Sequence, residues 1–175
     1  MKEPLIHPSS VKKWLQLGLL IAAGLILFVF ETLLPRPLPW FKLGLANLAT
    51  VLALYRFDGR AALLVTVARV LLGSLIVGAF MTPAFWLAFS AGVGSSLAMA
   101  GVKGCRRFSL SAIGVSLIGA LVHNSIQLLT AYWLIVHHAQ IFHLLPLLLF
   151  PALITGPLIG LLALLIVEKW QALAG

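Results

Sequence analysis

Four polar side chains lie deep within long apolar stretches of the sequence, where such groups are rare. They are Arg69 in the stretch 61–79 and His123, Asn124 and Gln127 in the stretch 112–136. A central arginine costs about 2.5–3.5 kcal/mol on membrane-insertion scales, so such groups usually face the interior of a helix bundle or a cavity. Guanidinium, imidazole and amide groups donate hydrogen bonds to carboxylates, phosphates and polar ring atoms. The pattern therefore predicts a site for a polar molecule.

Helical spacing places these residues on two faces. At 3.6 residues per turn, one stripe contains Ser116, Ala120, His123, Gln127 and Thr130, with Asn124 beside it, and another contains Thr66, Arg69 and Gly73. We expect the stripes and the polar residues near the outer helix ends to line one outward-opening cavity with a blind floor near mid-membrane. The candidate ligand-binding residues are Glu31, Lys42, Asn47, Arg69, Ser90, His123, Asn124 and Gln127. An apolar part of the ligand could pack on Phe85, Trp86 and Trp133.

These candidates also have a structural interpretation. Arg69 could anchor the bundle by donating to backbone carbonyls or to a carboxylate such as Glu31, which could instead pair with Lys42. The imidazole and amide side chains of the stretch 112–136 could bridge helices, because interhelical hydrogen bonds contribute about 0.6–2 kcal/mol in membranes. The clustering of all these groups favours a ligand site over separate helix contacts.

Neither a catalytic site nor a metal site is predicted. No nucleophile or paired carboxylates accompany His123, so an intramembrane enzyme is the least favoured function. No carboxylate or cysteine accompanies His137, His138 and His143, so these are interpreted as loop or interface residues. We expect no bound cofactor.

The elements that position the candidates are membrane-spanning helices. Hydrophobic residues make up 62% of the 175 positions and charged residues only 9%, and mean hydropathy is +1.12. A spanning helix needs about 20 mostly apolar residues. The six candidate spans are 14–34, 43–55 (short), 61–79, 84–102, 112–136 and 144–167. The alternation of barrel strands is absent, so we predict an all-α integral membrane protein, a six-transmembrane-helix bundle forming one domain over residues 1–175.

Basic residues indicate the orientation of the bundle. Nine of the lysines and arginines flank one set of helix ends and two, Arg36 and Lys42, lie on the opposite side. The positive-inside rule therefore predicts a multi-pass protein of the cell (cytoplasmic) membrane with both termini in the cytoplasm. The net charge of +8 is interpreted as a topology signal with contacts to anionic membrane lipid, and nucleic acid is not an expected partner.

Several segments together resemble one known family. They are Glu31 with Pro35-x-Pro37; Lys42-Leu43-Gly44-Leu45-Ala46-Asn47-Leu48; Arg69 with Leu71-Leu72; Ser90-x-Gly92 with Ser95 and Met99; and Ser111-x-x-Gly114-x-Ser116-x-x-Gly119-Ala120-x-x-His123-Asn124-x-x-Gln127. They resemble the Gx transporter family, whose members are often labelled heptaprenyl diphosphate synthase component I. That family is similar to the substrate-binding (S) components of energy-coupling factor (ECF) vitamin transporters. The resemblance covers residues 14 to 136 approximately.

The resemblance implies an S-component-like fold, with an external pocket gated by the loop between the first two spans. It also implies a small micronutrient-like ligand and a separate energising module made of a membrane coupling subunit and ATPases. The sequence itself contains no GxxxxGK[ST] motif, so energy would be supplied in trans. Prenyl chain elongation needs aspartate-rich motifs that hold Mg²⁺, and Asp58 is the single aspartate of this sequence. We therefore do not expect the chain to catalyse prenyl chain elongation.

We therefore expect a substrate-binding membrane transporter component. The cationic character of Arg69 and Lys42 favours a small anionic or aromatic ligand, either a micronutrient or an isoprenoid- or quinone-related precursor. The alternative is a non-transporting accessory membrane subunit in prenyl diphosphate or quinone metabolism. In that case the polar stripes would only hold helices together.

Overall fold

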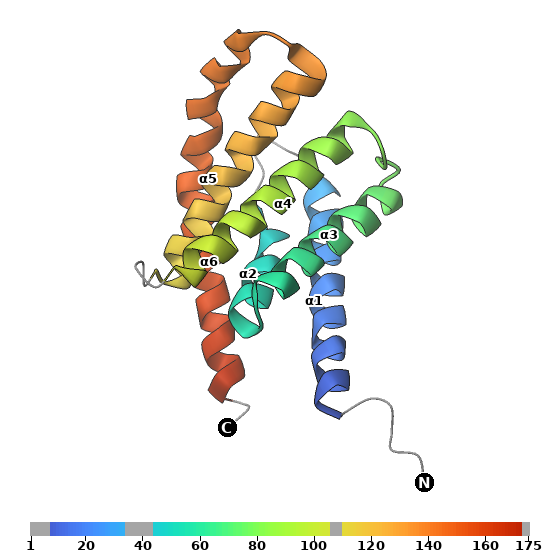
Figure 1. Cartoon of the computed structure of the whole chain (residues 1–175), viewed down its shortest axis with the longest axis vertical. Coiled ribbons are helices and arrows are strands. Elements are labelled where there is room, and N and C mark those ends of the chain that lie inside the picture. Colours follow the sequence, from blue (N-terminus) through green and yellow to red (C-terminus); the bar gives the residue numbers. More distant parts are fainter. Residues whose placement is uncertain (1–7, 34–43, 106–109, 173–175) are drawn as a thin grey trace.

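The computed structural model describes residues 8–33, 44–105 and 110–172 as a bundle of α-helices (Figure 1). The helices are α1 (Pro8–Leu33), α2 (Asn47–Arg56), α3 (Gly59–Ile76), α4 (Pro83–Gly104), α5 (Ala112–Ala131) and α6 (Leu145–Ala172). Between α5 and α6 lie a π-helix, η1 (Tyr132–Val136), and a 3₁₀-helix, η2 (Ala139–Leu144). The start of α1 and the end of α6 lie at the same end of the bundle. Lys42 lies outside the described residues.

Five helices in the described part of the chain are long and apolar enough to cross a membrane, so the all-helical membrane fold is confirmed. Helix α2, with ten residues, is too short, and the prediction of a sixth spanning helix over 43–55 is not confirmed. The helix begins later because Gly44 has a positive φ of 71° and starts a turn instead. In that turn the amide of Asn47 donates to the Gly44 carbonyl at 2.9 Å.

The third predicted span, 61–79, extends three residues beyond the end of the observed helix. Helix α3 stops at Ile76 because Gly78, with φ of 69°, adopts a left-handed conformation. The amide of Ala79 then donates back to the Ser74 carbonyl at 2.8 Å, which is the Schellman arrangement at a helix terminus. The residues between α3 and α4 therefore form a tight connection.

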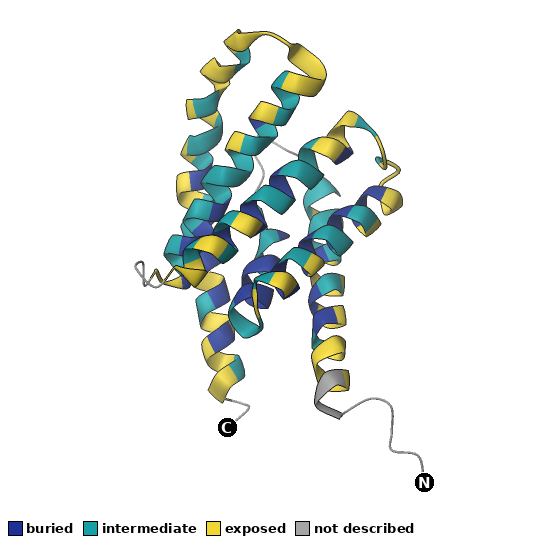
Figure 2. Ribbon diagram, in the orientation of Figure 1, coloured by how far each residue is buried: buried dark blue, intermediate teal, exposed yellow. Residues whose placement is uncertain are grey.

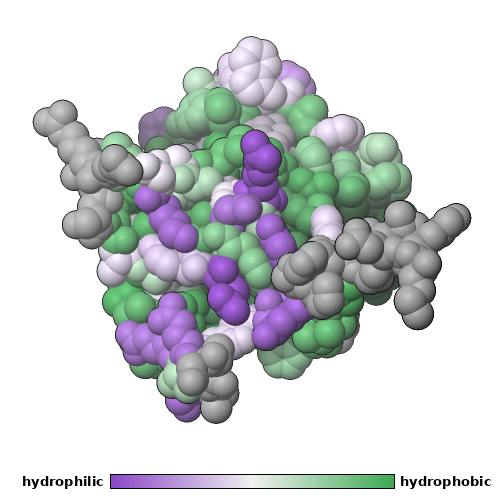
Figure 3. Space-filling view, turned by 60° about the horizontal axis from the view of Figure 1, so that its bottom comes forward, coloured by the Kyte–Doolittle hydropathy of each residue, from purple (hydrophilic) through white to green (hydrophobic). Residues whose placement is uncertain are grey.

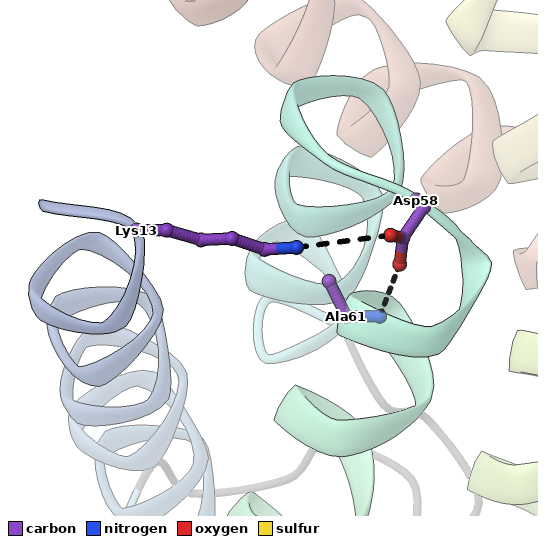
Figure 4. A network of polar contacts seen from close by, with 3 residues as sticks. All are labelled: Lys13, Asp58 and Ala61. Atoms are coloured by element: carbon purple, nitrogen blue, oxygen red, sulfur yellow. Dashed lines mark hydrogen bonds and ion pairs between the residues drawn. The ribbon is translucent and has the colours of Figure 1, made fainter. Parts of the chain in front are cut away.

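At the other end of α3, Asp58 caps the helix and links it to α1. One carboxylate oxygen of Asp58 accepts a hydrogen bond from the Ala61 amide at 2.7 Å, and the other lies 3.9 Å from the Lys13 ammonium (Figure 4). Both side chains are about half exposed, so the ion pair itself contributes little. The single aspartate of the sequence is thus a helix cap.

This end of the bundle carries the exposed basic side chains. In a view from this end, hydrophilic side chains gather over the centre and apolar side chains surround them (Figure 3). Exposed cations of the described chain here include Lys12, Lys13, Arg60, Lys103 and Lys169. Lys103 also donates to the Leu54 carbonyl at 2.6 Å, which satisfies part of the free end of α2. We call this the charged end of the bundle.

Helix α2 is the centre of the packed core. Its six consecutive residues 49–54 are all buried, and α1, α3 and α6 pack around it (Figure 2). Ten helical residues rise only about 15 Å, roughly half the apolar thickness of a bilayer. Because α2 begins at mid-bundle and runs to the charged end, it fills only that half of the interior.

A chain of hydroxyl groups ties α2 to its neighbours. Thr66 of α3 lies 2.8 Å from the hydroxyl of Thr50 on α2 and 2.8 Å from that of Ser96 on α4. All three residues are almost fully buried, so each bond satisfies a polar group that water cannot reach. These bonds fix the height of α2 relative to α3 and α4.

The close packing of α5 against α6 gives a test of the fold. A Cβ atom at Gly160 would lie 2.5 Å from the Ile113 Cα and 2.7 Å from the Ala112 carbonyl oxygen. Backbone atoms cannot yield as side chains can, so Gly160→Ala should destabilise the protein by about 1–3 kcal/mol in thermal unfolding in detergent. Gly101→Ala on α4 is the matched control, since nothing lies within 4 Å of its Cβ position. Equal stability of the two variants would contradict the α5–α6 packing.

Candidate functional site

The half of the bundle that α2 leaves unfilled contains a cavity of about 330 Å³. Every α-helix contributes to its wall. The lining comes from the late residues of α1 and α3, the early residues of α4, the middle of α5 and Thr155 of α6, with Gly44, Ala46 and Asn47 at the start of α2. The lining portions of α1, α3 and α4 lie in the half of the bundle away from the charged end, and those of α5 and α6 lie near mid-bundle. The start of α2 therefore forms the floor of the cavity.

Arg69 is the deepest charge in this cavity. Helix α3 holds it at 4% exposure, next to the close approach of Gly24 on α1, whose Cβ would lie 3.1 Å from the arginine Cδ. A guanidinium has five N–H donors, yet the bond that the structure gives is from Nη2 to the Asn47 Oδ1 at a long 3.3 Å. No atom of the described residues accepts from Nε. Arg69 is therefore a buried cation with donors to spare.

Glu31 on α1 lines the same cavity. Its carboxylate accepts a hydrogen bond from the Gly44 amide, which fixes the carboxylate against the segment that leads into α2. Both charges line one low-dielectric cavity, so the carboxylate attracts the Arg69 guanidinium through space. Among the described residues the two side chains form no direct ion pair. The pairing of Arg69 with Glu31 that the sequence left open is thus through space only.

Helix α5 contributes His123 and Asn124 to the opposite wall. Asn124 donates from Nδ2 to the Leu148 carbonyl of α6 at 3.1 Å, so its amide is oriented by the α5–α6 pair. Of the three α5 side chains predicted to bind the ligand, His123 and Asn124 therefore reach the cavity and Gln127 does not.

The rest of the wall is apolar and partly aromatic. Phe28 of α1, Val70 of α3 and Phe85 of α4 line it, together with several alanines that leave the volume open. Phe85 is buried and packs on Phe89 with ring centroids 5.5 Å apart. A ligand bound here would meet charge at the floor and apolar surface along the sides.

Of the eight residues predicted from the sequence, the cavity brings five together: Glu31, Asn47, Arg69, His123 and Asn124. Ser90 is not among its lining residues. It lies 2.8 Å from the Thr130 hydroxyl and so links α4 to α5. Gln127 is also outside the lining. Of the three aromatic candidates Phe85 lines the cavity, whereas Trp86 and Trp133 are exposed.

Some lining residues were not singled out from the sequence. Phe28, Ser74, Ala88 and Thr155 belong to this group. Thr155 precedes the Gly-Pro pair of the last span, and its hydroxyl type within an apolar segment is the one signal that could have identified it. The apolar residues carry no signal that separates them from ordinary helix packing.

A second, much smaller cavity lies beside the floor. It has about 20 Å³ and shares Gly44, Asn47, Ala120 and Thr155 with the large one. That is the space of one water molecule, and Ser116 and Asn47 supply polar partners. Fully buried residues such as Val51 and Leu54 follow along α2, so the floor is closed toward the charged end.

Comparisons with known proteins agree with this architecture. Residues 20–166 match the model of the protein family described as heptaprenyl diphosphate synthase component I. The structure is similar to that of the S component of a bacterial ECF transporter, with a TM-score of 0.71 and 18% sequence identity. The alignment covers 94% of this chain and 98% of that chain, so the whole fold is shared. A comparison with curated protein sequences finds no significant match.

Replacing Arg69 distinguishes a binding residue from a structural anchor. A buried charge without a close partner carries a desolvation cost that an apolar side chain of similar volume does not. We therefore expect Arg69→Met to unfold in detergent at or above the temperature of the wild-type protein without ligand. The matched control, Thr66→Val, loses two buried hydrogen bonds and should unfold earlier. A large loss of stability in Arg69→Met would make Arg69 an anchor.

Proposed function

Because the chain belongs to the heptaprenyl diphosphate synthase component I family and shares the fold of an ECF transporter S component, we propose that it is the substrate-binding component of a membrane transporter. The cavity around Arg69 is its ligand site. The observation that carries this proposal is a buried guanidinium, whose Nε has no acceptor among the described residues, in a cavity of about 330 Å³. Such a group is expensive in a membrane unless a partner arrives to fill its donors.

The distribution of charge supports one orientation. The exposed basic residues lie at one end of the bundle, and the cavity lies in the other half. With the charged end in the cytoplasm, both termini are cytoplasmic, all six helices lie in the membrane and the cavity faces outside. Helix α2 then reaches only the inner half of the bilayer. A ligand would be captured from outside and stopped at the floor made by Asn47.

The cavity favours a small ligand over a long prenyl chain. An engineered cavity of about 150 Å³ holds benzene, so about twice that volume accommodates a molecule of one or two rings. A heptaprenyl chain has about 35 carbon atoms and would need several times this space. A diphosphate would also bring more negative charge than one guanidinium compensates. The candidate ligands that remain are small micronutrient-like molecules with an acidic or electron-rich group.

The family description does not require synthase chemistry in this chain. Chain elongation holds a diphosphate with Mg²⁺ on aspartate clusters, and the sequence has one aspartate. That residue caps α3 and faces Lys13. We propose that the chain binds its substrate and that a separate coupling subunit with ATPases supplies the energy, in the manner that the S-component fold suggests.

Ligand binding in detergent tests the proposal. A small molecule that copurifies with the protein, identified by mass spectrometry, should raise the unfolding free energy by about 2.7 kcal/mol at 100 times its Kd. Arg69→Met should abolish this stabilisation, because the charged donor group is gone. The control Ser90→Ala should keep it, because that hydroxyl bonds to Thr130 outside the cavity.

The opposite result has a defined meaning. If no small molecule stabilises the protein and Arg69→Met leaves cellular uptake unchanged, the transporter proposal is wrong. A stable complex with an isoprenoid-metabolism protein, retained in Arg69→Met, would then establish the accessory-subunit alternative.

A further inference from the structure

Glu31 and Arg69 bring fixed charges of opposite sign to one cavity. We infer, on the basis of the proposed function, that the ligand is amphoteric: a small molecule with one acidic group that binds Arg69 and one amine or protonated ring nitrogen that binds Glu31. Neither charge is matched by a direct ion pair within the described residues that line the cavity. The two side chains together select the ligand class.

The acidic half of the recognition follows from the geometry of Arg69. Its Nε has no acceptor in the described chain, and its Nη2 bond to Asn47 is long. A carboxylate accepts two parallel bonds from a guanidinium, which is the strongest arrangement available to these donors. Asn47 accepts the Arg69 bond and is the first residue of α2. An acid bound to Arg69 would therefore lie at the first turn of α2.

The basic half follows from Glu31. An ionised carboxylate has about four acceptor positions, and in the described structure the Gly44 amide fills one of them. This bond holds the carboxylate in place and leaves its other oxygen for a donor. Gly44 in turn accepts a hydrogen bond from the Asn47 amide, so the Glu31 carboxylate lies beside the segment that forms the floor. A ligand that meets both charges therefore carries its acid and its amine close together at this end of the cavity.

Charge balance points the same way. A simple acid bound at Arg69 would share the low-dielectric cavity with the Glu31 carboxylate, and like charges in such a space repel strongly. An amine on the same molecule converts that repulsion into attraction. His123 is the third ionisable side chain of the lining. The rest of the ligand would lie against Phe28 and Phe85.

A matched probe series tests the inference. On each of several one-ring and two-ring scaffolds, the amino acid is compared with the corresponding acid without the amine and with the amine without the acid, using thermal shift and a titrated Kd. We expect the amino-acid form to bind at least about tenfold more tightly than either partner, the effect of one charge-assisted bond. Glu31→Gln should remove the advantage over the simple acid while simple-acid binding is kept or improved. Glu168→Gln, at an exposed acidic residue of α6, is the control.

Each outcome separates the two proposals. Simple acids that bind through Arg69 as tightly as the amino-acid forms, in wild type and Glu31→Gln alike, overturn the amphoteric ligand and leave the transporter function intact. A copurified molecule without a basic nitrogen would likewise overturn the amphoteric ligand and leave the transporter function intact. If no probe and no cellular extract stabilises the protein, the binding function is contradicted and the inference fails with it.

Discussion

The position of Arg69 above the first turn of α2 is the constraint on which the candidate site depends. A guanidinium at mid-bundle, 4% exposed and bonded at 3.3 Å to one amide, is unfavourable in a membrane protein unless something else in the fold requires it. If α2 began earlier in the sequence, the helix would fill the cavity. The chain instead turns at Gly44 and starts α2 late, which keeps the space next to the cation open.

The half of the bundle near the charged end contains the packed core, and the other half contains the cavity. Residues 49–54 of α2 are all buried, and the Thr50–Thr66–Ser96 bonds and the Lys103 cap fix the height of the helix. That rigidity sets the position of Asn47 and therefore of the cavity floor. In the other half, alanines and a few aromatic rings surround an open volume. A site built on the ends of rigid helices is more accurately preorganised than one built on loops.

The sequence predicted the polar part of this arrangement better than its boundaries. Arg69, His123 and Asn124 were identifiable because polar side chains within apolar spans usually face the bundle interior or a cavity. Ser90 and Gln127 share the same kind of spacing, yet a helical stripe is about 100° wide and borders both a neighbouring helix and a cavity. Ser90 therefore turned out to face Thr130. The helix ends at Asn47 and Ile76 depend on left-handed glycines, which periodicity does not reveal, and the apolar lining looks like any packed helix face.

An experimental structure of the protein with its copurified ligand tests the central claim most directly. The account predicts ligand density in the cavity between α1, α3 and α5, with an acidic group within hydrogen-bonding distance of the Arg69 guanidinium and Asn47 unmoved beneath it. Density bound elsewhere, or a guanidinium that donates to backbone carbonyls in a closed and solidly packed interior, would contradict it.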